Sequence, residues 1–282
     1  MMNTNQRSMD YVTKDRIYKF SQDCSKSSLA QFMYRFFPKE HVDSRMDWSN
    51  IRTDTTLCYH GYYAVIIPFK SKDGKIRNVL KVLYNPETGM IVRDGDGDAL
   101  IQHASKQNSR AGYESYPWGD KCYSIAKELA KGYRLEKIPT LFGMEKIYEA
   151  DHICVVTSVV DALVMSIICP HYPWVATGYE GMLGTTLYHS NVRRELIDQN
   201  AQITIFPEID GIAEAKEIQS YLLKSGIEAK VYPHWDYLKN CEYVGHRKSI
   251  ATIALKMLEM QYSYSDIMLA LRLIDESQLV PF

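Results

Sequence analysis

Long apolar runs are missing from this sequence of 282 residues. No stretch approaches the roughly 18 consecutive apolar residues that a membrane-spanning helix needs, so we expect neither a transmembrane segment nor a membrane partner. The opening stretch, MMNTNQRSMDYVTKD, has no apolar segment of the kind found in secretory signals. We therefore expect a cytoplasmic location.

Paired cysteines and a strong net charge are missing as well. The six cysteines form no Cys-x-x-Cys pair, so no zinc site is expected. The formal net charge is −1, which excludes a strongly basic chain but is compatible with a local basic face. Hydrophobic residues make up 46% of the chain, enough to bury a sizeable core in one or two domains.

The first part of the chain changes from helical to strand-like patterning. Residues 1–50 look helical, and SLAQFMYRFF carries an apolar stripe that ends at Pro38. Between residues 60 and 93, YYAVIIPF and IRNVLKVLY predict two strands joined by a tight turn at Asp73-Gly74.

This predicted hairpin is rich in positive charge. Five cations within twelve residues are candidate phosphate contacts for nucleic acid: Lys70, Lys72, Lys75, Arg77 and Lys81. The alternative is an ordinary solvated hairpin. Six aromatic residues are candidates for stacking on bases: Tyr62, Tyr63, Tyr84, Tyr113, Tyr116 and Trp118.

Strand and helix patterns alternate regularly from residue 152 onward. HICVVT, WVAT, ITIF and IEAKVYP predict strands separated by helices, which is typical of a parallel sheet with crossover helices. Ligands of such sheets bind outside the carboxyl ends of the strands. Thr157, Gly178 and Glu208 stand at these ends, and Gly181 follows in the loop after the second strand. Residues 246–282 predict one or two further helices.

Two acidic residues follow the third of these strands, in the stretch ITIFPEIDG. Glu208 and Asp210 are two residues apart and would point to the same side of an extended segment. Two carboxylates on one side can hold Mg²⁺ together with waters and a substrate phosphate. Alternatively, both acids stabilise the start of the following helix, where free N–H groups and the helix dipole favour negative charge.

These features together resemble a Toprim domain, the metal-binding catalytic fold of bacterial primases, topoisomerases and some nucleases. ITIFPEIDGIAEAKEI is similar to the family's acid-x-acid segment, and CVVTSVVDAL occupies the place of its first strand. The resemblance implies a glutamate there that acts as general base or metal ligand, but this chain has Thr157. A threonine hydroxyl carries no usable charge at pH 7. Asp161, one helical turn later, either substitutes for that glutamate or only complements the helix dipole.

The resemblance extends upstream to DnaG-type primases. YYAVIIPFKSKDGKIRNVLKVLY is similar to the stretch that precedes their Toprim domain, and YNPETG and IPTLFGMEKI look like segments of a primase-related family of bacterial mobile elements. The match covers about residues 25–235. It implies a Toprim-like (Rossmann-like) α/β domain with a mostly parallel sheet over residues 146–235. A smaller α+β primase-like subdomain over residues 1–145 would precede it, and a helical segment over residues 236–282 would follow.

The same resemblance implies a function and partners. It favours a primase-like protein that binds DNA or RNA in replication or maintenance of a mobile element. Its Mg²⁺ site would be weakened, and a helicase or another replication protein on a separate chain is a candidate partner. Two alternatives stay open: an active Mg²⁺-dependent nucleotidyltransferase or nuclease that tolerates Thr157, and a non-catalytic Rossmann-like module that binds a nucleotide or a protein.

Overall fold

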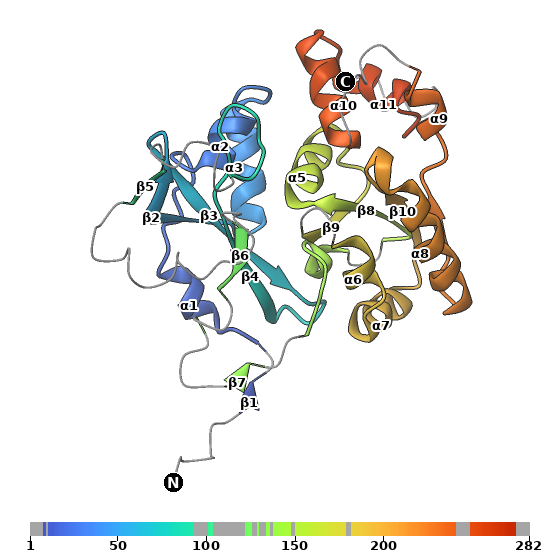
Figure 1. The fold of residues 1–282 in the computed structure, drawn as a ribbon, viewed down its shortest axis with the longest axis horizontal. Helices are drawn as coiled ribbons and strands as arrows, with labels where there is room; N and C mark the ends of the chain where they lie inside the picture. The colour runs from blue at the N-terminus through green and yellow to red at the C-terminus, as the bar shows by residue number, and fades with distance from the viewer. Residues whose placement is uncertain are drawn as a thin grey trace. The chain divides into compact units, whose positions relative to one another are not determined.

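The chain separates into two compact units, Met1–Ile138 and Pro139–Phe282, each with its own sheet (Figure 1). The computed structural model describes residues 8–9, 11–92, 101–103, 122–125, 129, 134–135, 138–147, 150–178, 182–240 and 249–274. The basic hairpin belongs to the first unit, and the acidic candidate residues belong to the second.

Short helices open the first unit. The helical pattern expected over residues 1–50 is divided among α1 (Lys14–Tyr18), α2 (Ser28–Met33) and α3 (Lys39–Trp48). The hydroxyl of Ser27 caps α2 by accepting a hydrogen bond of 3.1 Å from the N–H of Ala30. Pro38 ends the segment after α2 and stands directly before α3, because its fixed φ suits the entry to a helix.

An antiparallel sheet forms the centre of the first unit. Its strands, in the order β5-β2-β3-β4-β6, are β5 (Ile101–His103), β2 (Arg52–Tyr59), β3 (Tyr62–Lys70), β4 (Ile76–Val82) and β6 (Cys122–Ser124). The predicted hairpin is β3 and β4, and Gly74 supplies the positive φ of its turn. A separate parallel pair joins β1 (Ser8–Met9) to β7 (Arg134–Leu135).

Strand β2 is the longest of the strands that the sequence did not predict. Its first three residues, Arg52, Thr53 and Asp54, are polar but buried. They interrupt the apolar alternation that identifies a strand in a sequence. The cation that makes the burial of Asp54 tolerable is Lys81, which lies in another strand and is invisible to a local pattern.

The second unit contains the parallel sheet that the sequence predicts. Its strands, in the order β11-β10-β8-β9, are β11 (Ala229–Val231), β10 (Gln202–Phe206), β8 (His152–Ser158) and β9 (Trp174–Gly178). All neighbouring pairs are parallel. The carboxyl ends of β8, β9 and β10 therefore meet at one edge of the sheet.

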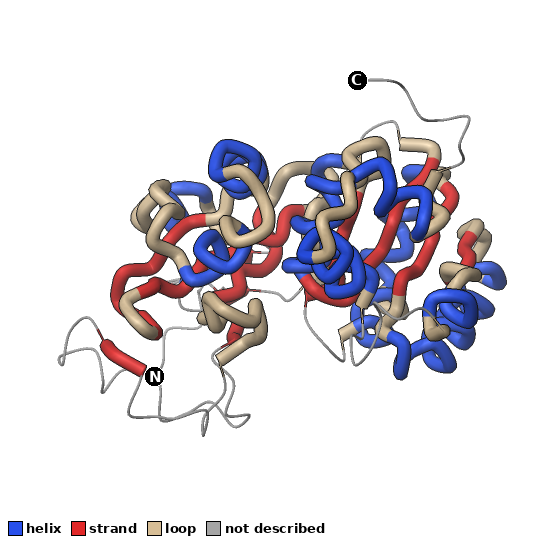
Figure 2. The backbone as a smooth tube through the Cα atoms, turned by 90° about the horizontal axis from the view of Figure 1, so that it is seen from above, coloured by secondary structure: helices blue, strands red, loops and turns tan. Residues whose placement is uncertain are grey.

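Helices cover both faces of this sheet (Figures 1 and 2). Helices α6 (Leu183–Leu187), α7 (Ser190–Gln199) and α8 (Ile212–Lys224) share a core with Ile153, Val155 and Ile203. Alternate strand residues point to the opposite face, against which α5 (Val159–Ile168) packs. Gly226, which the helix pattern places just after α8, has a φ of 80°, as a C-terminal capping glycine requires.

Three further helices follow β11: α9 (Trp235–Leu238), α10 (Ile250–Glu259) and α11 (Tyr264–Ala270). Helices α10 and α11 pack against α5. Both begin with a serine whose hydroxyl accepts a backbone N–H, Ser249 in α10 and Ser263 in α11. None of the helices in the described part of the chain is long and apolar enough to cross a membrane.

Candidate functional site

The carboxyl ends of β8 and β10 bring Thr157 close to Glu208. The two strands pair in parallel with Val156 opposite Phe206, so the chain leaves both at the same edge of the sheet. The Thr157 hydroxyl lies 3.5 Å from Oε1 of Glu208. The carbonyl of Thr157 accepts a hydrogen bond of 3.1 Å from the hydroxyl of Thr177 in β9. The Glu208 carboxylate is therefore next to a neutral hydroxyl at the position where a second acid would be expected.

Asp161 lies in the first turn of α5 and is only 5% exposed. Its N–H donates to the hydroxyl of Ser158, which caps the helix. Its carboxylate accepts a hydrogen bond of 3.0 Å from the hydroxyl of Ser249. Burial raises the pKa of Asp161 to about 7; the hydrogen bond from Ser249 opposes this change, and the negative charge of Glu208 adds to it. Near neutral pH this carboxyl is therefore only partly ionised.

The segment after β10 differs from the extended strand that the sequence predicts. Glu208 itself is extended, but Ile209–Gly211 forms a turn of 3₁₀ helix, η4, before α8 begins. This turn removes the two-residue alternation that would place both carboxylates on one side. Glu208 is half-buried, whereas Asp210 is exposed. The side chain of Glu208 makes no capping hydrogen bond to η4.

The oxygen donors at this edge do not reproduce the acid set that the Toprim resemblance implies. Among the residues that the structure describes, no group of three or more His, Cys, Asp or Glu side chains is placed to hold a metal ion. Thr157 offers a neutral hydroxyl, and Asp161 is hydrogen-bonded to Ser249. Mg²⁺ prefers an octahedral set of oxygens that includes one or two carboxylates. The carboxylate that lies beside Thr157 at this edge is that of Glu208.

Gly178 closes the same edge of the sheet. It ends β9 opposite Ser158 of β8, and its φ of 142° lies in the region that glycine adopts most readily. Gly178 therefore lies beside Ser158, the residue that caps α5. Gly181, the other predicted loop residue, lies outside the described residues.

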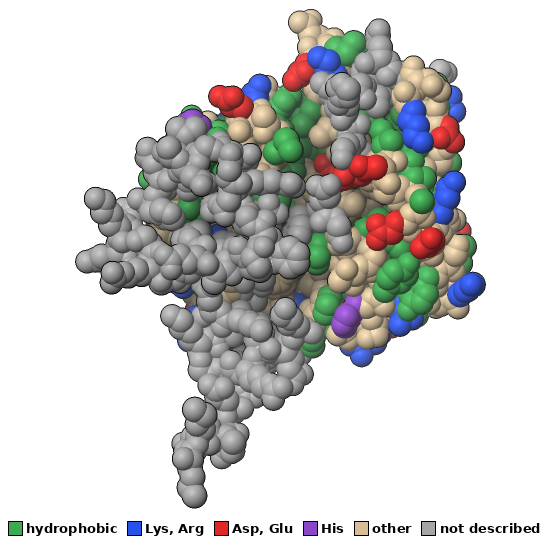
Figure 3. Space-filling view, viewed as in Figure 1, with side chains coloured by type: hydrophobic (Ala, Val, Ile, Leu, Met, Phe, Trp, Pro, Cys, Tyr) green, Lys and Arg blue, Asp and Glu red, His purple; other side chains and the backbone are tan. Residues whose placement is uncertain are grey.

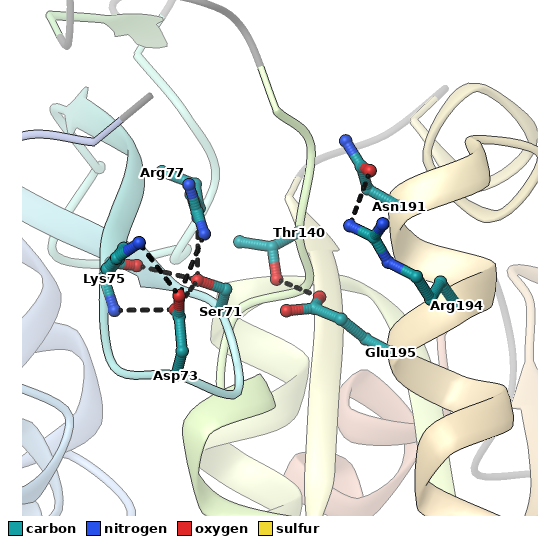
Figure 4. Close-up of polar contacts among 8 residues, drawn as sticks. All are labelled: Ser71, Asp73, Lys75, Arg77, Thr140, Asn191, Arg194 and Glu195. Carbon is teal, nitrogen blue, oxygen red and sulfur yellow. Dashed lines mark hydrogen bonds and ion pairs between the residues drawn. The ribbon is translucent and has the colours of Figure 1, made fainter. Parts of the chain in front are cut away.

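The tip of the β3–β4 hairpin holds two of its cations around Asp73 (Figure 4). Nζ of Lys75 lies 3.5 Å from Asp73, and Nη2 of Arg77 lies 3.1 Å from it. Ser71 accepts a hydrogen bond of 2.8 Å from Nε of Arg77 and donates to Asp73. Burial acts to raise the pKa of Asp73, but Ser71, the N–H of Lys75 and both cations outweigh it and lower the pKa. Lys70, which ends β3, is half-buried, as is Lys72 in the turn.

Lys81 does not join this group. It lies in the interior of β4, where Nζ is 2.5 Å from Oδ2 of Asp54 and also donates to the hydroxyl of Thr56 at 3.3 Å. Both side chains of the ion pair are less than 10% exposed, at 8% and 7%. The interpretation of Lys81 as a phosphate contact is therefore wrong, because its ammonium is enclosed and neutralised within the sheet.

Helix α7 of the second unit carries separate polar contacts. Thr140 donates a hydrogen bond of 2.9 Å to Glu195, and Arg194 donates one of 3.2 Å to Asn191 (Figure 4). The face of the second unit that Figure 3 presents carries Asp and Glu side chains toward its middle and Lys and Arg side chains toward its rim.

Two site residues escape sequence reasoning. Ser249 follows Asp161 by 88 positions in the chain, and no pattern in either segment connects them. Asp54 belongs to the unpredicted strand β2 and is the residue that determines the environment of Lys81. Alternating polar and apolar residues give the direction of a side chain, but only the strand pairing identifies the partner it meets.

A sequence model described as "Domain of unknown function (DUF6371)" matches residues 27–209, about two thirds of the chain. The chain belongs to this family. The DUF6371 region includes the hairpin and strands β8 to β10. It also includes Thr157, Asp161 and Glu208, which together with Asp210 we call the acidic edge. Among curated proteins, no sequence matches the chain significantly.

Solved primase structures show a distant similarity to this DUF6371 protein. The zinc-binding and RNA polymerase domains of Aquifex aeolicus primase match with a TM-score of 0.41 and 14% identity, over 89% of this chain and 62% of that one. The primase fragment of the bacteriophage T7 primase-helicase matches with 0.43 and 13%, over 81% and 70%. The RNA polymerase domain of Mycobacterium tuberculosis primase matches with 0.42 and 12%, over 92% and 86%. These TM-scores are too low to establish a common fold, and the chain spans less than two thirds of the Aquifex chain.

Proposed function

We propose that this chain is a primase-like, Toprim-related protein that binds nucleic acid and has a degenerate metal site. Its setting would be the replication or maintenance of a mobile element. The sequence resemblance to Toprim and DnaG-type motifs supports the family relationship. The arrangement of Thr157, Asp161 and Glu208 supports the loss of metal-dependent catalysis, and the basic hairpin supports nucleic-acid binding.

The observation that carries the proposal is the separation of the acids at the carboxyl edge of the sheet. Metal-assisted phosphoryl transfer depends on carboxylates that hold the ion and neutralise developing charge. Thr157 contributes no charge, Asp161 is buried and bonded to Ser249, and Asp210 is exposed on the turn after Glu208. One half-buried carboxylate beside a hydroxyl is a weak basis for Mg²⁺ binding and provides no general base in the position of the family glutamate.

The hairpin supports the binding part of the proposal. Lys75 is exposed, and the guanidinium of Arg77, whose side chain is 10% exposed, pairs with Asp73. Phosphate oxygens compete well for guanidinium and ammonium groups, since each contact also releases a counterion from the nucleic acid. Asp73 holds both cations on one side of the turn until a phosphate takes its place. We infer that Lys70 and Lys72, which flank the turn, extend this contact.

One observation favours the alternative of an active Mg²⁺-dependent nucleotidyltransferase or nuclease. The charge of Glu208 raises the pKa of Asp161, so the two carboxyls are close enough to interact. A divalent cation at Glu208 would favour the ionised form of Asp161. In that case Asp161 would supply the acidic group that Thr157 lacks.

An assay of primer synthesis and of nuclease activity, with Mg²⁺ or Mn²⁺ and the purified full chain, separates the two functions. We expect no turnover for the wild type and none for Glu208→Ala. Metal-dependent activity that Glu208→Ala abolishes would overturn the degenerate site.

Nucleic-acid binding is tested in parallel by fluorescence anisotropy at several salt concentrations. We expect the affinity to fall with salt, and the charge reversal Lys72→Glu/Lys75→Glu/Arg77→Glu to weaken binding by at least about 10-fold and to lower the salt dependence. Arg194→Glu, on α7 of the second unit, is the matched control and should have little effect. Binding that is insensitive to salt and to the hairpin reversal would instead favour a module for a nucleotide or a protein.

A further inference from the structure

Arg52, the first residue of β2, is a buried cation without a counterion. It is 7% exposed, and its Nε is enclosed without a hydrogen-bond partner. Among the described residues, the nearby carboxylate of Asp54 is paired with Lys81, and Arg52 forms no ion pair. An arginine stays charged at every relevant pH, and burying an unpaired charge is strongly unfavourable. The charge of such a group favours an anion bound at the nearby surface.

The guanidinium of Arg52 lies against an aromatic ring. Its guanidinium carbon lies 5.4 Å from the ring centre of Tyr18, at the end of α1. Tyr18 is 57% exposed, so the ring is presented to solvent while Arg52 supports it from within the unit. Stacking against a guanidinium limits the freedom of the ring and leaves it ready to stack with a further planar group.

Helix α1 joins this pair to the hairpin. The N–H of Val12 donates a hydrogen bond of 2.7 Å to the carbonyl of Ile76 at the start of β4. Val12 and Ile17 share a core cluster with Ile76 and Val79, so α1 packs its apolar side on the hairpin sheet. Just before α1, the ring of Tyr11 lies 5.5 Å from Nζ of Lys75.

The outward residues of α1 are mostly positive. Three exposed cations and one exposed acid accompany Tyr18 on this segment: Lys14, Arg16, Lys19 and Asp15. We call the set of Tyr11, Lys14, Arg16, Tyr18, Lys19, Arg52 and Lys75 the α1 strip. It interleaves aromatic rings with cations over three segments, since Tyr18 contacts Arg52 of β2 and Tyr11 contacts Lys75 of the hairpin turn. Aromatic rings interleaved with cations are the combination that binds single-stranded nucleic acid.

We propose that the α1 strip is a binding site for single-stranded nucleic acid, in which Tyr18, held against the buried guanidinium of Arg52, stacks on a base while the exposed cations beside it contact the adjacent phosphates. This inference rests on the proposed nucleic-acid function and adds a base-contacting site to the hairpin. A paired base cannot stack on Tyr18 without leaving its duplex, so the strip selects single strands over duplexes.

The aromatic candidates taken from the sequence do not offer the same surface. Tyr62 and Tyr63 are half-buried in β3, and Tyr84 is buried. Tyr113, Tyr116 and Trp118 lie outside the described residues. The signal for Tyr18 was present in the short stretch KDRIYKF, where basic and aromatic residues alternate, but its importance depends on Arg52, 34 positions later in the chain.

The test measures binding of a fluorescein-labelled oligothymidylate of about 12 nucleotides, a length within the range of single-strand sites, to the full chain. Tyr18→Ala should weaken binding by about 10-fold, the usual effect of removing one stacked base. Arg52→Met keeps the volume but removes the charge and should weaken binding to a similar degree. Tyr18→Phe retains the ring and should bind as the wild type does, which separates stacking from any change in folding.

Tyr237→Ala is the matched control. Tyr237 is 46% exposed and its ring centre lies 4.3 Å from the guanidinium carbon of Arg272, so it is also an arginine-supported tyrosine but belongs to the second unit. This variant should bind as the wild type does. A duplex of the same sequence should bind more weakly than the single strand and should not respond to Tyr18→Ala.

The outcomes distinguish this inference from the function on which it rests. If the hairpin charge reversal abolishes binding while Tyr18→Ala and Arg52→Met bind normally, the α1 strip is wrong and the proposed function stands. If Tyr18→Ala and Tyr237→Ala weaken binding equally, the strip is also wrong. If the wild type binds no oligonucleotide at low salt, both proposals are overturned.

Discussion

Two aspartates, one in each unit, are buried to nearly the same extent and have opposite pKa shifts. Asp54 in β2 and Asp161 in α5 are both 5% exposed. For Asp54, burial acts to raise the pKa, but the ion pair and hydrogen bond with Lys81, aided by Thr56, lower it overall. For Asp161, burial dominates and the pKa rises to about 7.

The difference lies in the partner and not in the depth of burial. Lys81 gives Asp54 a full positive charge at 2.5 Å, whereas Ser249 gives Asp161 one neutral hydroxyl at 3.0 Å. A hydroxyl compensates part of the desolvation of a carboxylate and a cation compensates much more. The buried acid of the first unit therefore links β2 to β4 across β3, whereas the buried acid of the second unit has a charge that changes near neutral pH.

The largest effect on stability is expected from removing the buried ammonium of Lys81, which pairs with Asp54 in the first unit. Lys81→Met should destabilise the protein by about 3 to 5 kcal/mol at pH 7, because Asp54 would then be a buried charge without a partner. Urea unfolding of the full chain measures the loss. The loss should shrink at low pH, where Asp54 becomes protonated.

The double variant Asp54→Asn/Lys81→Met should recover much of that stability, since no unpaired charge is left in the sheet. Lys75→Met, which removes an exposed cation of the same hairpin, is the matched control and should change stability by less than about 1 kcal/mol. A loss that is the same at every pH and in the double variant would show that Lys81 acts by packing alone.

The second largest effect concerns the pH dependence of the second unit. The pKa of Asp161 is about 7 in the folded state against an ordinary value of 3.8. The neutral form is favoured by folding, so its contribution is complete below pH 4 and is lost as the pH rises to about 7. Asp161→Asn keeps an oxygen for Ser249 but cannot ionise. It should be more stable than the wild type at pH 8, on the order of 2 to 4 kcal/mol.

Unfolding measured at pH 5 and at pH 8 checks this expectation. Ser249→Ala serves as the comparison, because it removes both the hydrogen bond to Asp161 and the cap of α10 and should lower stability at both pH values, by about 1 to 2 kcal/mol. If Asp161→Asn shows the same dependence on pH as the wild type, Asp161 is not the titrating group.

The smallest effect should come from Asp73 at the hairpin turn. Asp73→Asn keeps the acceptor for Ser71 and the N–H of Lys75 but releases the charges of Lys75 and Arg77. Affinity for single-stranded oligonucleotide should rise by about 2- to 5-fold, while stability should change by less than about 1 kcal/mol, as for other exposed ion pairs. A fall in affinity would mean that Asp73 positions the two cations for binding.

The regular elements of the second unit were predictable because their residues carry the information locally. HICVVT and ITIF are continuous apolar runs, as expected of strands buried on both faces, and β8 and β10 form there. Strand β2 was missed for the opposite reason, since its buried Arg52, Thr53 and Asp54 imitate a solvent-exposed segment.

The candidate site was predictable only in part. The alternation of strands and helices placed the carboxyl ends of β8, β9 and β10 at one edge of the sheet (Figure 1). Thr157, Gly178 and Glu208 stand at those ends. The turn at Ile209–Gly211 and the bond from Ser249 to Asp161 were not predictable, because the first depends on how α8 enters the fold and the second on a residue far along the chain.

The hydrogen bond from Ser249 to Asp161 also has a consequence for the order of folding. The residues it joins are 88 positions apart, and the entropy lost on closing a long loop delays such contacts relative to local ones. The helix–strand repeats from β8 to β11 can form from neighbouring segments, whereas the environment of Asp161 is incomplete until α10 docks on α5. We therefore expect the environment of Asp161 to form last during folding. The pKa of Asp161 would then change when α10 and α11 pack against α5.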